Sequence, residues 1–324
     1  MTRCYYCYKE LKEGEIGFHR SCLKKMFNDT ICPVIDFQHA DLKKLAEEII
    51  RSQTTLTGVQ AKLSLDIVSE SKEKRFTIVG LWGRYILKPQ TEIYANLPEI
   101  EDLTMHLAEI SGIEVVPHTL IPIADGQLCY LTRRIDRLND GYKLAMEDMC
   151  QLSERLTEYK YKGSYEQIAK LITKYSSVPK LDVIKFWEIV LFSWLVGNSD
   201  MHLKNFSLQE TINGDYVLSP AYDLLNTSIH VNDEDFALQN GLIPKSEYSE
   251  VYSKTSHPCK DDFITFGNRI GVVQKKLYST IEMFATEQEK VYELIENSFL
   301  EEKVKRMYKQ SYIERLHRFQ RSDK

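Results

Sequence analysis

The most regular hydrophobic pattern in the chain covers residues 181–197. Apolar side chains recur there at intervals of three and four positions, the spacing that gathers them on one face of an α-helix. Gly197 follows the pattern, and glycine favours the end of a helix. We therefore expect a buried helix that leads into a polar loop over residues 198–205. The apolar positions are Val183, Phe186, Trp187, Val190, Leu191 and Trp194.

Weaker patterns predict further helices and strands. Helical spacing or helix-start signals predict helices over residues 39–51, 98–110, 145–151 and 165–175, and three or four more over 261–324. Alternation of apolar and polar residues predicts strands over residues 63–68, 76–79, 85–89, 115–123 and 128–134. An Asp125-Gly126 turn joins the last two of these strands, and an Asn213-Gly214 turn joins short strands at 206–208 and 216–218.

The order of these elements predicts an α+β chain with two main parts. Its 324 residues suggest about two domains or lobes. We expect a cysteine-containing cap at residues 1–37, a β-rich lobe at 38–137 and a larger, mainly helical lobe at 138–324. Residues 133–137 would link the two lobes.

The polar loop after the expected buried helix carries the strongest chemical signal. Asp200 and Asn205 stand five positions apart, and Asp223 follows the next hairpin. Phosphoryl transfer from ATP uses such a set, in which one carboxylate takes the hydroxyl proton while an amide and a second carboxylate hold Mg²⁺. We therefore expect Asp200 to act as the base, with Asn205 and Asp223 as Mg²⁺ ligands. His202 and Lys204 lie in the same loop, where Lys204 could neutralise charge on the transferred group.

A lysine at the end of a strand could complete a nucleotide site. Lys88 lies at the end of the strand expected over 85–89, and a hydroxyl-rich loop with one glycine, Gly58, precedes these strands. Loop, strand, turn and a strand ending in lysine form the layout of a lobe that covers nucleotide phosphates. Glu101, on the next helix, could pair with Lys88. The alternative is a solvated strand end and a glutamate that favours the helix dipole.

The first 35 residues contain a second candidate site. Cys4 and Cys7 form one close pair, and His19 and Cys22 form another. Two such pairs suit tetrahedral zinc, because each pair can present two ligands from one turn. An ordinary cap with reduced thiols is the alternative, and Cys32 stands outside the set.

Composition and charge bear on the cellular compartment of the protein and on a basic segment near its C-terminus. The net charge of −5 gives no global signal for nucleic acid. Residues 303–324 are rich in Lys and Arg, as in a packed terminal helix with a solvated basic face or in a patch for nucleic acid or an acidic partner. The N-terminus lacks the pattern of a signal peptide, and the longest apolar stretch, 189–196, is too short to span a bilayer. With seven cysteines, an odd number, we expect a cytoplasmic protein with reduced thiols. Export as an effector is the alternative.

These motifs, in this order, resemble the HipA family of serine/threonine kinases from bacterial toxin–antitoxin systems. The similarity runs from about residue 55 to residue 319. Residues 55–62 look like the Gly-containing loop of the family, and residues 86–89 look like its ATP-lysine strand. The remaining matches are the Glu-Asp-x-Cys-Gln segment at 147–151 and the catalytic and metal motifs at 200–206 and 222–223.

The resemblance implies a two-lobed, kinase-like fold and phosphorylation of proteins with ATP and Mg²⁺. By motif position it assigns Asp200 as the base, Asn205 and Asp223 as Mg²⁺ ligands, and Lys88 as a phosphate ligand with Glu101 as its partner. Around the nucleotide it adds Thr57, Gly58, Val59, Gln60, Arg133, Ile135 and His202. Arg133 departs from the glutamate that full-length members often have in the linker.

The resemblance also implies substrates and partners. Known members phosphorylate aminoacyl-tRNA synthetases and limit themselves by phosphorylating a serine in the Gly-containing loop. The matching positions here are Thr55 and Thr57, both threonines. The chain resembles the shorter HipT-type members, so the implied partners are a HipB-type antitoxin and a small separate protein like the N-terminal subdomain of HipA. DNA would be reached only through the antitoxin.

Two other functions stay open. A small-molecule kinase related to antibiotic phosphotransferases shares the Asp-x4-Asn spacing. A non-catalytic module with a degenerate kinase fold could bind DNA or an antitoxin. The intact set of Lys88, Asp200, Asn205 and Asp223 argues against degeneracy.

Overall fold

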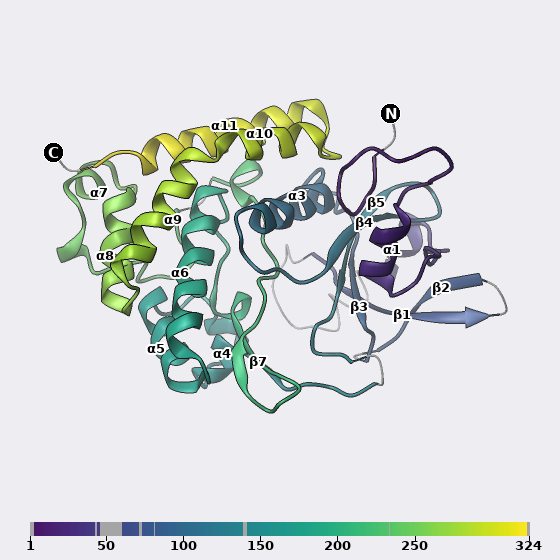
Figure 1. The fold of residues 1–324 in the computed structure, drawn as a ribbon, viewed down its shortest axis with the longest axis horizontal. Helices are drawn as coiled ribbons and strands as arrows, with labels where there is room; N and C mark the ends of the chain where they lie inside the picture. Colours follow the sequence, from purple (N-terminus) through teal and green to yellow (C-terminus); the bar gives the residue numbers. More distant parts are fainter. Residues whose placement is uncertain are drawn as a thin grey trace. The chain divides into compact units, whose positions relative to one another are not determined.

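The computed structural model describes residues 3–42, 44–45, 60–70, 73–80, 82–138, 141–232 and 234–322 (Figure 1). The chain forms two compact units. The first contains Met1–Leu103, Val116–Tyr142 and Asn297–Glu301, and the second contains Thr104–Val115, Lys143–Glu296 and Glu302–Lys324. Helix α3 (Leu97–Ile110) begins in the first unit and ends in the second. The expected domain boundaries after residues 37 and 137 stay predictions.

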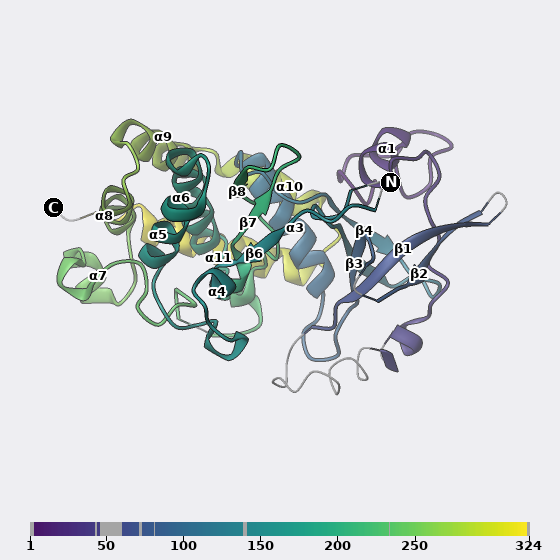
Figure 2. The ribbon, with the colours of Figure 1, turned by 90° about the horizontal axis from the view of Figure 1, so that it is seen from below.

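A five-stranded antiparallel sheet forms the centre of the first unit, and Figure 2 shows its long β1–β2 hairpin. The spatial order of the strands is β2-β1-β3-β5-β4. Leu63 and Leu65 of β1 and Leu87 of β3 are buried, as alternation along a half-buried strand requires. The strands are β1 (Leu63–Glu70), β2 (Glu73–Ile78), β3 (Tyr85–Lys88), β4 (His118–Pro122) and β5 (Leu128–Arg133).

The N-terminal segment packs on this sheet and shares its core. Helix α1 (Arg20–Phe27) buries Phe27, whose ring centroid lies 6.1 Å from the rings of Phe76 in β2 and Tyr85 in β3. Val34 extends the sheet, because its backbone exchanges hydrogen bonds of 2.9 Å with Lys74 and Phe76. The cap expected from the sequence is therefore part of the first unit.

Helix α6 (Pro179–Leu195) forms the centre of the second unit (Figure 1). Its expected apolar face is buried and packs against α5, α8 and α11. The indole of Trp187 is also satisfied, because Nε1 donates a 3.0 Å hydrogen bond to the carbonyl of Phe263 in α8. A three-stranded sheet with the order β6-β7-β8 lies in the same unit.

The remaining elements of the second unit are short strands, helices and single turns. The strands are β6 (Met146–Asp148), β7 (Ser207–Glu210) and β8 (Tyr216–Leu218). The other helices are α4 (Met149–Leu152), α5 (Tyr165–Tyr175), α7 (Glu250–Thr255), α8 (Lys260–Ile270), α9 (Gln274–Thr286), α10 (Gln288–Asn297) and α11 (Glu302–Phe319). Turns of 3₁₀-helix cover Thr157–Tyr159, Leu203–Asn205, Thr227–Ile229 and Lys245–Glu247.

Most expected elements are confirmed, with two errors and one open case. The expected strands and their hairpins are present, and Tyr308, Tyr312, Leu316 and Phe319 form a buried stripe on α11. The helix expected over 145–151 is wrong, because Met146–Asp148 pairs with β7 as a strand and only Met149–Leu152 is helical. Helix α7 was not expected. The helix expected over 39–51 is present at 39–42 and 44–45, and the rest lies outside the described residues.

Among the residues that the structure describes, no helix is both long and apolar enough to cross a membrane.

Candidate active site

The loop after α6 starts with a glycine that no larger residue could replace without strain. Gly197 has a positive φ of +77°, the conformation that ends helices at glycine. A Cβ atom at this position would lie 2.4 Å from Ser228 Oγ and 2.7 Å from Asn226 Oδ1. The backbone of Gly197 and Asn198 also bonds back to α6, at Trp194 and Ser193. The start of the loop is therefore held against the helix and the segment around residue 227.

Asp200 presents a carboxylate that is 51% exposed and held by two neighbours. The hydroxyl of Tyr161 donates a 2.9 Å hydrogen bond to its Oδ1, and the side-chain oxygen of Asn198 accepts one of 3.1 Å from its backbone N–H. A hydrogen bond to the charged form stabilises a carboxylate and fixes its orientation. Asp200 therefore has an oriented oxygen at an accessible position, as a proton acceptor needs.

Asn205 is buried and its amide is oriented by the same loop. Its Nδ2 donates a 3.0 Å hydrogen bond to the carbonyl of Asp200. The nitrogen is thereby occupied, which leaves the side-chain oxygen as the atom that could face a metal. Amide and carboxylate oxygens are the hard ligands that Mg²⁺ prefers, with water completing its octahedron.

Asp223 follows the β7–β8 hairpin, and its neighbour Tyr222 ties this segment to the loop that carries Asn205. The Tyr222 hydroxyl lies 2.5 Å from Ser207 Oγ and donates a 2.9 Å hydrogen bond to the carbonyl of Lys204. The chain neighbour of Asp223 thus contacts the chain neighbour of Asn205. Asp223 itself has a φ of 60°, a strained value for a residue with a side chain that is often found at functional sites. The donor set of Asn205 and Asp223 fits a magnesium ion.

His202 is a neutral imidazole inside the loop. Burial lowers its pKa to about 4, and the nearby carboxylates of Asp200 and Asp223 oppose this shift only in part. Its Nε2 lies 4.0 Å from Asp200 Oδ2, and the Tyr161 ring packs edge-on against it at 5.2 Å. At neutral pH His202 therefore contributes packing and a polar edge rather than a positive charge.

Lys204 has a partner that the sequence did not predict. Its Nζ donates a 2.7 Å hydrogen bond to Asp148 Oδ2. The other oxygen of Asp148 accepts the backbone N–H of Gln151, whose side chain in turn accepts the Asp148 N–H at 2.9 Å. This capping box explains two residues of the Glu-Asp-x-Cys-Gln segment. Its Cys150 is buried and hydrogen-bonds the carbonyls of Arg155 and Leu156.

The first unit contains the expected lysine–glutamate pair. Lys88 Nζ donates a 2.5 Å hydrogen bond to Glu101 Oε1, and both side chains are almost fully buried. The ammonium also lies 5.4 Å from the centre of the Tyr130 ring. The pairing expected from sequence is therefore present, whereas the alternative of a solvated strand end is wrong.

The structure describes only some of the other residues assigned to the nucleotide. Thr55, Thr57, Gly58 and Val59 lie outside the described residues. Gln60 donates a 3.1 Å hydrogen bond to the carbonyl of Pro89, next to Lys88. Arg133 directs its guanidinium to the carbonyls of Lys25 and Met26 at the end of α1, at 3.3 and 3.4 Å. Ile135 is half-buried. Nucleotide contacts by these residues stay predictions.

The four residues of the candidate zinc knuckle converge in the first unit. We call Cys4, Cys7, His19 and Cys22 the cysteine–histidine cluster. One potential ligand atom from each lies within 4.8 Å of all the others. His19 Nδ1 is 3.4 Å from Cys7 Sγ and 3.7 Å from Cys22 Sγ.

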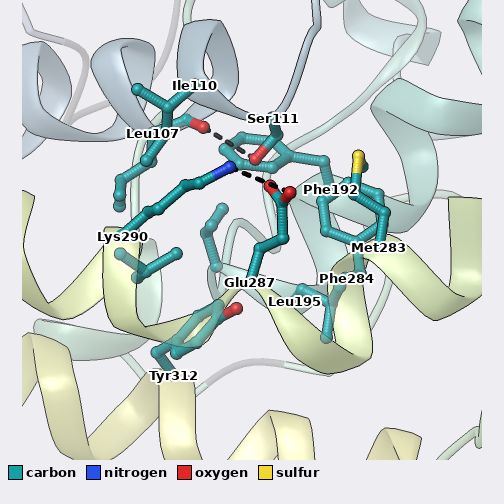
Figure 3. A pocket seen from close by; sticks show the side chains of 12 residues that line it. Leu107, Ile110, Ser111, Phe192, Leu195, Met283, Phe284, Glu287, Lys290 and Tyr312 are labelled. Atoms are coloured by element: carbon teal, nitrogen blue, oxygen red, sulfur yellow. Dashed lines mark hydrogen bonds and ion pairs between the residues drawn. The ribbon is translucent and has the colours of Figure 1, made fainter.

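A cavity in the second unit is too small to hold a nucleotide. Figure 3 shows it among the end of α3, α6, α9, α10 and α11, with Ser111 bonded to the Leu107 carbonyl and Lys290 paired with Glu287. Its volume of about 20 Å³ is room for about one water molecule. Small-molecule sites usually measure roughly 300–1,000 Å³. We interpret this cavity as a packing gap.

A larger groove in the first unit is mostly apolar. Its volume is about 720 Å³. Its lining comes from the N-terminal segment, the end of β4 and Phe299, and contains none of the residues assigned to ATP. The principal lining residues are Tyr5, Phe18, Ile35, Ile121, Ile123 and Phe299.

Sequence reasoning missed Tyr161 and Asp148 as neighbours of the expected site residues. Nothing local to Tyr161 indicates its bond to Asp200, 39 positions later. For Asp148, the Asp-x-x-Gln spacing indicates a capping box with Gln151, but it does not indicate the bond to Lys204.

Comparisons with known proteins identify the family of the chain. The family model described as the HipA-like C-terminal domain matches residues 54–292. A Haemophilus influenzae protein named "Putative kinase" is 28% identical over 331 residues, which cover 93% of this chain and 92% of that protein. A Sinorhizobium fredii protein named "Putative kinase Y4dM" is 34% identical over 200 residues, which cover 57% of this chain and 48% of that protein.

Two solved structures share the fold. HipA of Shewanella oneidensis, solved with HipB and operator DNA, superposes with a TM-score of 0.62 at 22% identity and covers 85% of this chain and 70% of that one. The Helicobacter pylori proinflammatory kinase CtkA superposes with a TM-score of 0.51 at 15% identity. The match covers 72% of this chain and 87% of that one. These likenesses establish the two-lobed, kinase-like fold, and the named relatives support a kinase. The chain belongs to the HipA family, with a HipA-like C-terminal domain at residues 54–292.

Proposed function

We propose that this chain is an ATP- and Mg²⁺-dependent serine/threonine protein kinase of toxin–antitoxin type. The observation that carries the proposal is the loop of the second unit, where an accessible, oriented Asp200 carboxylate stands on the same backbone turn as a buried Asn205 amide. Phosphoryl transfer asks the protein for positioning and charge stabilisation more than for covalent chemistry. This loop offers both.

Each group has a separate task in the proposed reaction. Asp200 orients the hydroxyl of the acceptor and receives its proton. Asn205 and Asp223 hold Mg²⁺, which neutralises charge on the phosphates of ATP when it is bound. Lys88 contacts the phosphates, and Glu101 keeps its ammonium in place.

Lys204 and His202 act on the loop. Lys204 is tied to Asp148 and also adds a positive charge beside the reacting groups. His202 stays neutral and fills the space next to Asp200. We propose that Gln60, Arg133 and Ile135 contribute to the nucleotide environment.

The proposed acceptor is an aminoacyl-tRNA synthetase or another translation component. The proposed partners are a HipB-type antitoxin and a small protein like the N-terminal subdomain of HipA. Support for the antitoxin comes from the Shewanella oneidensis HipA, whose structure contains HipB and operator DNA.

We also propose that the kinase limits itself through Thr55 or Thr57, in the Gly-containing loop. Phosphorylation would add nearly two negative charges to a segment that has to cover ATP. Such a loop would be repelled by the phosphates, and activity would fall.

The experiment that tests this function is a phosphotransfer assay on wild type and Asp200→Ala. Each protein is incubated with Mg²⁺, γ-labelled ATP and a panel of purified aminoacyl-tRNA synthetases, and labelled sites are mapped by mass spectrometry. We expect phosphoserine or phosphothreonine on a synthetase or on Thr55 or Thr57, and none with Asp200→Ala. Labelling of aminoglycosides or choline but of no protein would instead establish a small-molecule phosphotransferase.

A further inference from the structure

We propose that the cysteine–histidine cluster binds one Zn²⁺ and that the bound ion fixes Tyr8 against Asp102 of α3, next to Glu101. The metal site stands without the proposed kinase function. Only its effect on ATP rests on that function.

The ligand set is that of a structural zinc site. Three cysteine sulfurs and one imidazole nitrogen come from two close pairs, and structural Zn²⁺ takes four such ligands in a tetrahedron. Cys4 and Cys22 are buried, and Cys7 is half-buried. Cys32 lies in the same unit outside the cluster, where its Sγ donates to the carbonyl of Pro33.

The second nitrogen of His19 identifies the ligand atom. Nε2 lies 2.9 Å from the carbonyl oxygen of Glu10, which can only accept a hydrogen bond. Nε2 therefore carries the proton, and the lone pair is on Nδ1, which faces the sulfurs of Cys7 and Cys22. Zinc-bound histidines are held in this way, through a backbone carbonyl on the nitrogen away from the metal.

The backbone around the cluster also resembles a metal loop. The N–H of His19 points to Cys4 Sγ at 3.5 Å, and the N–H of Tyr8 bonds to the carbonyl of Cys4 at 2.9 Å. Tyr8 directly follows Cys7 and has a φ of 59°. A bulky residue in this conformation is strained and persists only when its surroundings fix it. A metal on Cys4 and Cys7 would fix it from one side.

Tyr8 connects this loop to the helix that carries Glu101. Its hydroxyl donates a buried 2.7 Å hydrogen bond to Asp102 Oδ2. The other oxygen of Asp102 is 2.7 Å from His118 Nδ1 in β4. Glu101, the residue before Asp102 in α3, accepts a hydrogen bond from Lys88. All five side chains belong to the first unit.

Loss of the ion would therefore act on the start of α3. The strained loop could relax, and the Tyr8 hydroxyl would leave Asp102. Residues 97–103 would open more often, and Lys88 would be positioned less well for phosphate.

The first experiment measures zinc. Inductively coupled plasma mass spectrometry of the purified full chain is expected to give about one Zn²⁺ per chain for wild type and for the control Cys32→Ser, and about a tenfold lower content for Cys22→Ser. Wild type without bound zinc, or equal contents in Cys22→Ser and wild type, would overturn the site. Because Cys22→Ser could unfold the chain, wild type is also loaded with Co²⁺. Intense visible bands of tetrahedral thiolate coordination support the cluster, and an octahedral spectrum overturns it.

The second experiment measures amide hydrogen exchange in residues 97–103 and does not depend on nucleotide. We expect protection to fall on zinc chelation and in Tyr8→Phe, and to stay in Tyr5→Phe, a control on the same segment. Unchanged protection in Tyr8→Phe with zinc retained would overturn the connection. If wild type binds MgATP, Tyr8→Phe should weaken it by about fivefold. If wild type does not bind MgATP, the kinase proposal fails. The zinc content and the hydrogen exchange of residues 97–103 would still test the zinc site and its connection to α3.

Discussion

Asp148 pairs with Lys204 through one carboxylate oxygen, at 2.7 Å, while the other oxygen caps helix α4. Asp148, in the Glu-Asp-x-Cys-Gln segment, thus holds Lys204, which lies 56 positions later in the loop that also carries Asp200. The two tasks of Asp148 can be separated, because asparagine also caps helices but carries no charge.

Asp148→Asn should therefore keep most of the stability and lose activity. Without the ion pair, Lys204 is free to leave its position, and we expect the rate of phosphotransfer to fall by about tenfold, about 1.4 kcal/mol of transition-state stabilisation. Asp148→Ala should in addition lose about 1 kcal/mol of unfolding free energy with the cap. Urea denaturation and initial rates distinguish the two variants. Equal rates for wild type and Asp148→Asn would show that the pair has no catalytic importance.

Gly197→Ala should destabilise the loop far more than a glycine substitution at a matched turn. Both Gly197 and Gly214 have a positive φ, +77° and +81°. A Cβ at Gly197 would meet Ser228 Oγ at 2.4 Å, whereas nothing lies within 4 Å at Gly214. We expect Gly214→Ala to cost about 1 kcal/mol of unfolding free energy and Gly197→Ala about 3 kcal/mol. Similar losses in the two variants would contradict the close approach.

Lys88→Met should lower the unfolding free energy by about 3 kcal/mol, because Glu101 would stay buried without its lysine. The control is Lys290→Met, which removes the ion pair with Glu287 (Figure 3). The side chains of this pair are 61% and 39% exposed, so the pair should be worth less than about 1 kcal/mol. Chemical denaturation at neutral pH compares them. A small loss in Lys88→Met would mean that water reaches the pair in solution.

Stability should fall in mild acid through His202. Its pKa is about 4 in the folded chain because it is buried, and about 6.5 when unfolded. The unfolded state therefore binds the proton first, so stability is full above about pH 6.5 and is lost as the pH falls toward 4. Between about pH 7.5 and pH 5 the loss should be about 2 kcal/mol.

The difference between wild type and His202→Gln in urea denaturation measures this contribution. His317→Gln, at an exposed position of α11, is the control. A parallel pH dependence in wild type and His202→Gln would contradict the burial of His202.

Elements with a long one-sided pattern could be predicted from the sequence, because burial alone decides them. The face of α6 and the stripe of α11 are buried as expected. Residues 145–151 could not be assigned in this way, because pairing with β7, far along the chain, makes Met146–Asp148 a strand. Helix α7 is only six residues long, and its main signal is the cap by Ser249.

The candidate site shows the same division. Asp200, Asn205 and Asp223 could be named as candidates from their spacing, because phosphoryl transfer fixes the types and order of its residues. The Tyr161–Asp200 and Lys204–Asp148 contacts join residues 39 and 56 positions apart, and the Tyr8–Asp102 contact joins residues 94 apart. Only the fold brings such pairs together, so no local pattern could reveal them.

The most direct measurement of the central claim is the affinity of the full chain for ATP, by isothermal titration calorimetry with and without Mg²⁺. We predict that wild type binds ATP and that Mg²⁺ strengthens the binding. Asp223→Ala should lose this Mg²⁺ effect and Lys88→Met should bind at least about tenfold more weakly. Asp215→Ala, on the exposed turn of the β7–β8 hairpin that precedes Asp223, should bind like wild type. ATP binding that ignores Mg²⁺, or that is equal in wild type and Asp223→Ala, would contradict the account.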